Sequence, residues 1–300
     1  MDTDLDSLAT ALYVTVDDLL IDHPDWAPER PPGGIVPKTT DSEIITLAVI
    51  AALLGHDCER GFIRWAKKHL TPWFPNIPNQ PGYNKRLRKL IDVMGLVQAA
   101  LAASTDRWAD GVWVVEATPV ECGRSRETAK RSELAGWAEY GYCAAHSRYF
   151  WGLRLHLVRA LAGLPVLFAL TGAKADERDT LVSMLDGSPA RPGQVIIGDK
   201  NYFGRDFEQA LAGQGVKPLR KARKGEKPRP GGQFFRPLRQ TIESVNNTLK
   251  TQHGLERHGG RTKAGVTARV LAKILALTAA IWHNEHTGAP VLRSLTAYDH

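Results

Sequence analysis

Cysteine is scarce in this chain, and its cysteines are too far apart to form a cluster. Cys58, Cys122 and Cys143 are the three in 300 residues, and no CxxC pair occurs. An odd number of widely spaced cysteines argues against a disulfide framework and against a structural zinc site. Three thiols of this kind are typical of a reducing cytosol.

Signals for export, membrane insertion and several common chemistries are also missing. The N-terminus has no basic-then-apolar signal segment, and the apolar stretches LAVIAALLG and VLAKILALTAAIW are too short or interrupted to span a bilayer. The chain has no GxxxxGK[ST] phosphate loop and no assignable serine or cysteine triad. His253 and His258 have the wrong spacing for a helical metal pair. For His283 and His286, three apart at the end of the last expected helix, structural or surface roles are favoured over metal binding. We therefore expect a cytoplasmic protein with no membrane partner.

Acidic residues become sparse after the first 30 residues. That segment holds eight acids and one base, which leaves 38 basic and 24 acidic residues, a net charge of +14, in residues 31–300. An excess of this size favours a polyanionic partner, with nucleic acid before an anionic membrane surface. Charge that serves only solubility is the alternative.

The pattern of apolar residues changes from helical to mixed near residue 105. Helices are expected at 41–56, where Thr40 and Glu43 have capping-box spacing, at 60–69 and within 83–104, with a proline-rich loop at 71–82. The rest predicts a mixed α/β layout. Its expected elements are strands at 111–120, 148–161 and 163–172, a helix at 175–187, a strand ending near 198, a helix at 205–215, a short strand from 215, a basic loop at 221–237, and helices at 238–252 and 264–284.

Two acids follow apolar runs that read as buried strands. Glu116 closes GVWVVE and Asp199 closes QVIIGD. Acids just past a buried strand lie at the carboxyl edge of a sheet, where ligands of open α/β sheets bind. A solvated strand end is the alternative for either acid alone.

A third acid lies on a predicted helix with other polar residues. At 3.6 residues per turn, Arg239, Glu243, Asn246, Asn247 and Lys250 share one face. The alternative is an exposed face on which Arg239 pairs with Glu243. Three carboxylates that met at one point would repel without cations between them, and a divalent ion such as Mg²⁺ or Mn²⁺ suits such hard oxygen ligands.

The segment before that helix is strongly basic. Its cations are Lys217, Arg220, Lys221, Arg223, Lys224, Lys227, Arg229, Arg236 and Arg239, and Glu226 is its acid. Prolines and glycines argue against regular structure, and Phe234 and Phe235 could stack on bases or anchor the loop. We interpret it as an arm that tracks phosphates, with a solvated disordered loop as the alternative.

These features together resemble the DDE transposases of bacterial insertion sequences. VVEATPVECGRS is similar to the first-strand motif of that family, VIIGDKNYFG to the motif of the second Asp, and Arg239, Glu243 and Lys250 to the RxxxExxxxxxK signature. The resemblance implies a ribonuclease-H-like α/β domain at 106–287, a helical N-terminal region at 1–105 that recognises DNA ends, and a tail at 288–300. Lys85, Arg86, Arg88 and Lys89 would help that recognition.

The resemblance also implies a chemistry. Glu116, Asp199 and Glu243 would be the catalytic acids and the ligands of Mg²⁺ or Mn²⁺ in DNA cleavage and strand transfer. Arg239 and Lys250 would bind phosphate near the scissile bond, with Lys221, Arg223 and Lys224 of the arm as further substrate contacts. The expected partner is double-stranded DNA, both the terminal inverted repeats of the element and the target. A homodimer on DNA, associated with the nucleoid, is expected.

Two departures from the family pattern leave alternatives open. Arg236 stands where the signature has Tyr, and Glu116 stands where the first motif has Asp. Glutamate is longer by one carbon–carbon bond, about 1.5 Å. The chain could therefore be a catalytically impaired DNA-binding relic, or a ribonuclease-H-like nuclease without strand transfer.

Overall fold

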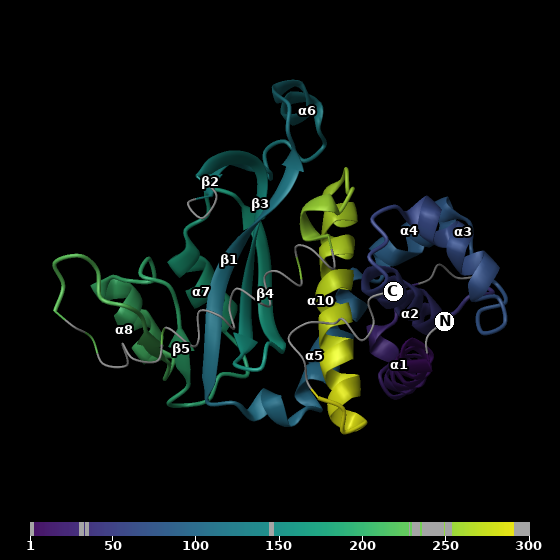
Figure 1. Ribbon diagram of the computed structural model, residues 1–300, viewed down its shortest axis with the longest axis horizontal. Coiled ribbons are helices and arrows are strands. Elements are labelled where there is room, and N and C mark those ends of the chain that lie inside the picture. Colours follow the sequence, from purple (N-terminus) through teal and green to yellow (C-terminus); the bar gives the residue numbers. More distant parts are fainter. Residues whose placement is uncertain are drawn as a thin grey trace. The chain divides into compact units, whose positions relative to one another are not determined.

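The chain forms two compact units in the computed structural model. One comprises Met1–Ser104 with Thr248–His300, and the other Thr105–Asn247. The structure describes residues 3–29, 33, 36–143, 147–227, 229, 235, 249 and 254–290. Within these ranges the first unit is helical and the second carries a sheet (Figure 1).

The helical unit is built from both ends of the chain. The long last helix α10 packs against α5 and α2, and also contacts α1 and α4. The helices are α1 (Thr3–Asp22), α2 (Asp41–Leu53), α3 (Glu59–His69), α4 (Gln80–Lys89), α5 (Ile91–Ala103) and α10 (Lys263–His286), with short 3₁₀ turns η1 (Pro24–Trp26) and η6 (Leu255–Arg257). Helix α10 falls within the predicted catalytic domain at 106–287. Its packing here is with the N-terminal helices, and the functional boundaries stay a prediction.

Helix α10 is long and apolar enough to cross a membrane by length and composition. Of its most apolar stretch, 83% is buried inside the structure, and the core helix of a soluble protein meets the same two criteria. The helix is therefore weak evidence for a membrane span.

Local signals explain how two of the helices begin. The Thr40 side chain accepts from the Glu43 backbone N–H and the Glu43 side chain accepts from the Thr40 N–H, so the predicted capping box starts α2. Helix α4 begins at Gln80, inside the expected loop, because Pro81 in a first helical turn has no N–H to leave unpaired. What read as one helical stretch is two helices, α4 and α5, which meet at Leu90.

The second unit is a six-stranded mixed sheet with helices α7 and α8 beside it (Figure 1). The order is β2-β3-β1-β5-β6, and β4 also pairs with β3. β1 runs antiparallel to β3 and parallel to β5. The elements are η2 (Asp106–Ala109), β1 (Val112–Gly123), α6 (Arg126–Arg131), β2 (Glu139–Cys143), β3 (Arg148–Ala160), β4 (Pro165–Gly172), α7 (Glu177–Leu185), β5 (Val195–Ile197), α8 (Arg205–Gly213) and β6 (Lys217–Leu219).

Strand register assigns the side chains to two faces. Val114 pairs with Arg159 and Glu116 with Leu157, so these residues share one face, called here the Glu116 face. Val114 and Ile197 on that face pack with Phe235. On the opposite face Val115 lies beside Leu181 of α7 and Leu211 of α8. Apolar side chains on both faces are typical of a sheet whose strands are buried on two sides.

Candidate active site

Glu116 lies in the middle of β1 beside a buried arginine. The Glu116 Oε1 is 3.5 Å from the Arg159 Nε, which reaches it from the neighbouring strand β3. The Arg159 side chain is fully buried, and that of Glu116 is 12% exposed. A charge so deeply buried is stable only with an opposite charge near it, so the pair holds the Glu116 carboxylate at the sheet.

Asp199 follows β5 in a short polar turn. The last registered pair of the parallel strands is Val114 with Ile197, and Glu116 and Asp199 each lie two residues further along. Side chains two residues apart on a strand point to the same face, and paired strands are about 4.8 Å apart. The Asp199 carboxylate accepts from the Asn201 N–H at 2.7 Å and from the Asn201 Nδ2 at 3.0 Å. Because β5 ends at Ile197, this alternation does not extend to Asp199, which lies at the strand level of Glu116 and acts electrostatically on Glu177 of α7.

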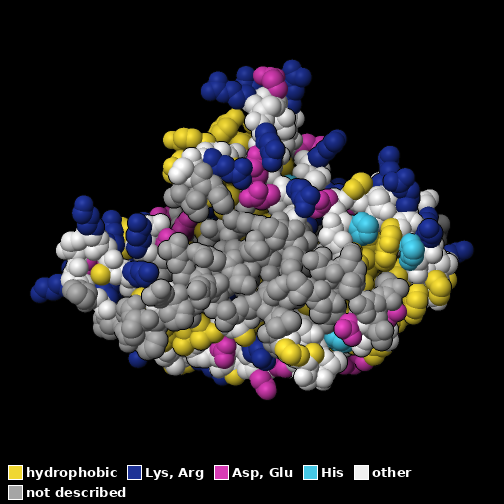
Figure 2. Space-filling model, viewed as in Figure 1, with side chains coloured by type: hydrophobic (Ala, Val, Ile, Leu, Met, Phe, Trp, Pro, Cys, Tyr) yellow, Lys and Arg dark blue, Asp and Glu magenta, His cyan; other side chains and the backbone are white. Residues whose placement is uncertain are grey.

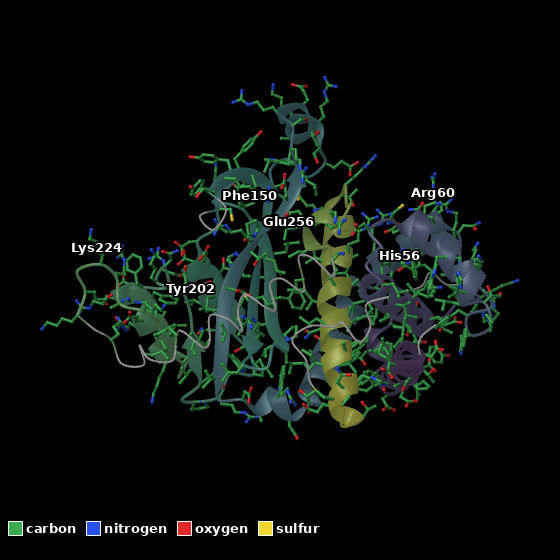
Figure 3. The ribbon with its side chains drawn as sticks, in the orientation of Figure 1. His56, Arg60, Phe150, Tyr202, Lys224 and Glu256 are labelled. Atoms are coloured by element: carbon green, nitrogen blue, oxygen red, sulfur yellow. The ribbon has the colours of Figure 1, made fainter. Side chains whose placement is uncertain are left out.

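Tyr202, three residues after Asp199, is a buried side chain, and it is labelled in Figure 3. Its side chain is 3% exposed, and a side chain on Gly198 would meet its ring at 2.7 Å. Burial, and then Glu177, Asp199 and Glu116, raise the pKa of Tyr202 well above its ordinary value. The hydroxyl thus stays protonated at neutral pH.

The N-terminus of α7 contacts the segment that follows Asp199, and this contact was not predicted from the sequence. Asp176 caps the helix by accepting from the Arg178 and Asp179 backbone N–H groups. Arg178 Nη1 donates to the Phe203 carbonyl at 3.1 Å, four residues past Asp199. The sequence Asp-Glu-Arg at 176–178 predicts the start of a helix, but it does not predict the contact with Phe203.

Glu177 adds a carboxylate that sequence reasoning missed. It forms an ion pair with Arg154 of β3. Burial raises the pKa of Glu177, with Arg154 opposing and Asp199 adding to the rise. Arg154, His156 and Arg159 within an otherwise apolar strand were the available signal, because a buried strand rarely carries three such side chains without partners.

The third predicted acid, Glu243, lies outside the described residues, as do Arg239 and Lys250. The nearest described point before it is Phe235, which packs on Val114 and Ile197 of the Glu116 face. Within the described ranges, no three His, Cys, Asp or Glu side chains are grouped closely enough to hold a metal ion.

Ion pairs with acidic side chains hold part of the basic arm after β6 in place. Arg220 is 4% exposed and pairs with Glu226 at 2.7 Å and with Glu208 of α8 at 3.4 Å. Arg229 pairs with the same two acids, each at 3.1 Å. Hydrogen bonds from Arg220 and from the Arg223 backbone hold the pKa of Glu226 far below its ordinary value. Two of the nine predicted phosphate-tracking cations therefore fold the arm.

The remaining described cations of the arm face outward. Lys221, Arg223, Lys224 and Lys227 are exposed. The Arg223 guanidinium lies 3.7 Å from the centre of the Phe203 ring, which presents it next to the Asp199 turn. Lys224 lies at the outer end of the loop, and Lys and Arg side chains gather there on the surface (Figures 2 and 3). These side chains are available to phosphate.

Replacing Lys221, Arg223, Lys224 and Lys227 together by Ala should flatten the salt dependence of DNA binding. Each lost phosphate contact lowers the log–log slope by about 0.9. The matched control replaces Lys174 and Arg191, exposed cations of the same unit, by Ala and should leave the slope unchanged. Fluorescence anisotropy from 50 to 300 mM salt measures it. An unchanged slope in the fourfold variant would assign the arm to another role.

His156 is a buried histidine on the face opposite Glu116. It is 1% exposed, and its Nε2 lies 2.9 Å from the Thr171 hydroxyl. Burial, and secondarily Arg154, lower the pKa of His156 to about 4. The ring is therefore neutral in the folded protein at neutral pH.

The stability of the folded chain should fall as the pH drops below 6.5. Between pH 6.5 and 4 the unfolded chain binds a proton at His156 that the folded chain does not. The stability is full above pH 6.5 and about 3 kcal/mol of it is lost by pH 4. Urea denaturation of the wild type and of His156→Gln across this range measures the difference. If the two pH profiles run parallel, His156 does not titrate as described.

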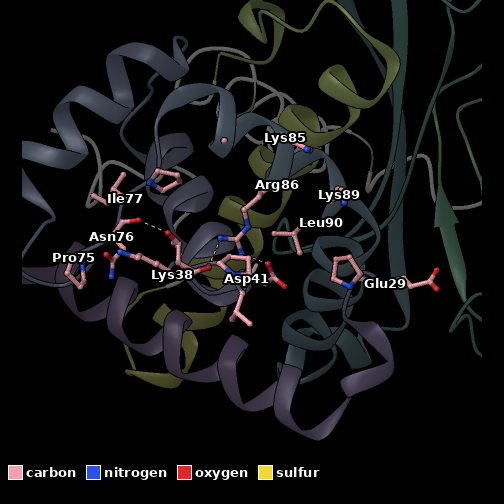
Figure 4. A pocket seen from close by; sticks show the side chains of 16 residues that line it. Glu29, Lys38, Asp41, Pro75, Asn76, Ile77, Lys85, Arg86, Lys89 and Leu90 are labelled. Atoms are coloured by element: carbon pink, nitrogen blue, oxygen red, sulfur yellow. Dashed lines mark hydrogen bonds and ion pairs between the residues drawn. The ribbon is translucent and has the colours of Figure 1, made fainter. Parts of the chain in front are cut away.

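The helical unit contains a cavity of about 810 Å³ (Figure 4). Lys38, Lys85 and Lys89 line it, and their side chains are exposed. Arg86 lines it too, but its guanidinium is engaged by Asp41. Three lysines around a cavity with proline and aliphatic walls suit an anionic ligand.

Residues 107–279 match the family described as transposase DDE domain. The chain belongs to this family. The match covers more than half of the sequence and includes Glu116, Asp199 and Glu243. The predicted recognition is confirmed, and so is the predicted fold class: a mixed α/β, ribonuclease-H-like transposase fold with a helical N-terminal region. No curated protein matches the chain.

The family makes this chain a transposase-type protein that acts on DNA, and DDE transposases generally use divalent metal ions. Glu116 lies within β1, which continues to Gly123, and not at the end of the strand, where it was expected.

Proposed function

We propose that the protein is the transposase of an insertion sequence, which binds the ends of its element and catalyses metal-dependent strand cleavage and strand transfer. The observation that carries this proposal is the parallel pairing of β1 and β5, because Glu116 and Asp199 each follow the Val114–Ile197 pair by two residues on adjacent chain segments. Glu243 would supply the third carboxylate, and Phe235, eight residues before it in the sequence, packs with Val114 and Ile197 of the sheet.

The residues suit Mg²⁺ or Mn²⁺ by their chemistry. Carboxylate oxygens are the hard ligands that these ions prefer. Glu116, Asp199 and Glu243 would hold the ions. When bound, the ions would activate the attacking oxygen and stabilise the leaving oxygen of an in-line displacement at phosphorus.

The side chains of the chain have separate tasks in this proposal. Arg159 and Asn201 orient the carboxylates of Glu116 and Asp199, and Arg178 holds the turn that carries Asp199. Lys221, Arg223 and Lys224, with Arg239 and Lys250, bind the DNA backbone. The helical unit, with Lys85 and Lys89, recognises the terminal inverted repeats. The protein works in the cytoplasm on the nucleoid, as a homodimer on double-stranded DNA.

A catalytically impaired DNA-binding relic is the second candidate, favoured by Glu116 in place of Asp and by its ion pair with Arg159. A plasmid that carries the element ends separates the candidates. An active transposase excises the element in Mg²⁺ and does nothing in EDTA. A relic binds the ends without cutting them, and a nuclease without strand transfer cuts but joins no new target.

A further inference from the structure

Three tyrosines form an exposed aromatic patch at one end of the sheet. Tyr140 and Tyr142 of β2 and Tyr149 of β3 are 51%, 46% and 79% exposed. Tyr142 pairs directly with Tyr149, and their ring centres are 5.1 Å apart. Tyr140 pairs with Trp151, two residues from Tyr149, so all three tyrosines lie on one face. They are called here the tyrosine patch.

The core does not require the tyrosine patch. The alternate residues of β2 anchor the strand instead, since Cys143 packs with Phe150 and Ala173 on the other face. A side chain on Gly141 would come within 2.8 Å of Ala173, so that face is already closely packed. β2 lies at the end of the strand order. Several large aromatic rings that are exposed together on one face of a sheet indicate a binding surface.

Cations stand beside the patch. β1 ends at Gly123, which pairs with Trp151, which in turn pairs with Tyr140. With strands about 4.8 Å apart, the chain enters the α6 segment within about 10 Å of the patch. The segment 124–131 carries four exposed cations, which are Arg124, Arg126, Lys130 and Arg131. Arg124 forms an ion pair with Glu121, and Lys130 and Arg131 both pair with Glu127, so the four cations are set against two acids. Figure 2 shows Lys and Arg side chains over α6, with hydrophobic ones beside β2.

We propose that the tyrosine patch and the cations of α6 form a binding surface for single-stranded DNA, with unpaired bases stacked on the tyrosines and phosphates at α6. Aromatic rings with an adjacent basic surface are the pattern by which proteins bind unpaired strands without sequence preference. The positive charge favours this partner over a second copy of the chain. The inference rests on the proposed function, because strand cleavage at an element end exposes unpaired nucleotides.

The test is the affinity of the full chain for a labelled 20-nucleotide single strand in EDTA, measured by fluorescence anisotropy. Replacing Tyr140, Tyr142 and Tyr149 by Ala should weaken binding at least tenfold, while replacing all three by Phe should change it less than about twofold, because Phe keeps the ring. The matched control is Trp73→Ala, which removes an aromatic side chain 52% exposed in the other unit and should have no effect. Equal melting temperatures show that the variants fold.

Three results would overturn the inference. The first is a wild type that does not bind the strand at all, and the second is a folded triple Ala variant that binds the strand like the wild type. The third is a triple Ala variant that changes only the oligomeric state in light scattering, which would make the patch a protein interface. EDTA separates this test from the proposed function: tyrosine-dependent binding without metal-dependent cleavage of duplex ends would sink the transposase proposal and leave this inference standing.

Discussion

Asp199→Asn is expected to lower metal-dependent cleavage of element-end DNA at least about a thousandfold, roughly 4 kcal/mol of transition-state stabilisation. The amide keeps the size of the side chain and an oxygen that can still accept from the Asn201 N–H, so the turn after β5 should persist. What it removes is the negative charge that a divalent ion requires. Single-turnover cleavage of a labelled end duplex measures the effect.

The matched control for this change is Asp206→Asn. Asp206 is an exposed acid in the first turn of α8, seven residues after Asp199. Its replacement should leave the cleavage rate within about twofold of the wild-type rate. DNA affinity in EDTA should be the same for both variants, because the cations that bind phosphate are untouched. Cleavage by Asp199→Asn at the wild-type rate would remove Asp199 from the site.

Local sequence patterns were sufficient for the strands that carry the acids. GVWVVE and QVIIGD are runs of β-branched and aromatic residues that end in an acid, and the structure has β1 and β5 there. Parallel pairing of these strands follows from the helices between them, since parallel neighbours require crossover connections. The register that brings Glu116 level with Asp199 depends on contacts between residues about 80 positions apart, which no local pattern specifies.

What the sequence could not predict are the partners of the charged side chains. Arg159 lies 43 residues after Glu116, and Arg154 lies 23 residues before Glu177. Only the pairing of β3 with β1, and the packing of α7 on β3, turns them into neighbours. β2 was missed for a different reason. Its five residues, with Gly141 in the centre, are too few for a period-2 signal.

These partners change how the acidic site is understood. Without a metal ion, carboxylates that gather at one place raise one another's pKa. In this chain β3 supplies a guanidinium to a carboxylate on each face of the sheet, Arg159 to Glu116 on one face and Arg154 to Glu177 on the other. The strand thus offsets part of the negative charge on both faces. The ion pair with Arg159 also gives a physical reason for a Glu at position 116, because the longer side chain carries the carboxylate to Arg159.

The Glu116–Arg159 pair therefore leads to a prediction about Glu116→Asp. Shortening the arm by about 1.5 Å withdraws the carboxylate from a guanidinium that is now 3.5 Å away. We expect cleavage to fall about tenfold, although Asp is the family's usual residue. Glu116→Ala should abolish cleavage. It should also lower the free energy of unfolding by about 3 kcal/mol, because the buried Arg159 charge loses this carboxylate.

Glu116→Gln serves as the control for size, since it keeps the arm and removes the charge. It should abolish cleavage as fully as Glu116→Ala if the carboxylate binds a metal ion. Urea denaturation and end-duplex cleavage, measured on the same preparations, separate lost folding from lost chemistry. A rise in activity for Glu116→Asp would mean that the site has not adapted to the longer arm and that Arg159 restrains catalysis. Unchanged cleavage by Glu116→Ala would place the first catalytic acid elsewhere, with Glu121 of the same strand the nearest candidate.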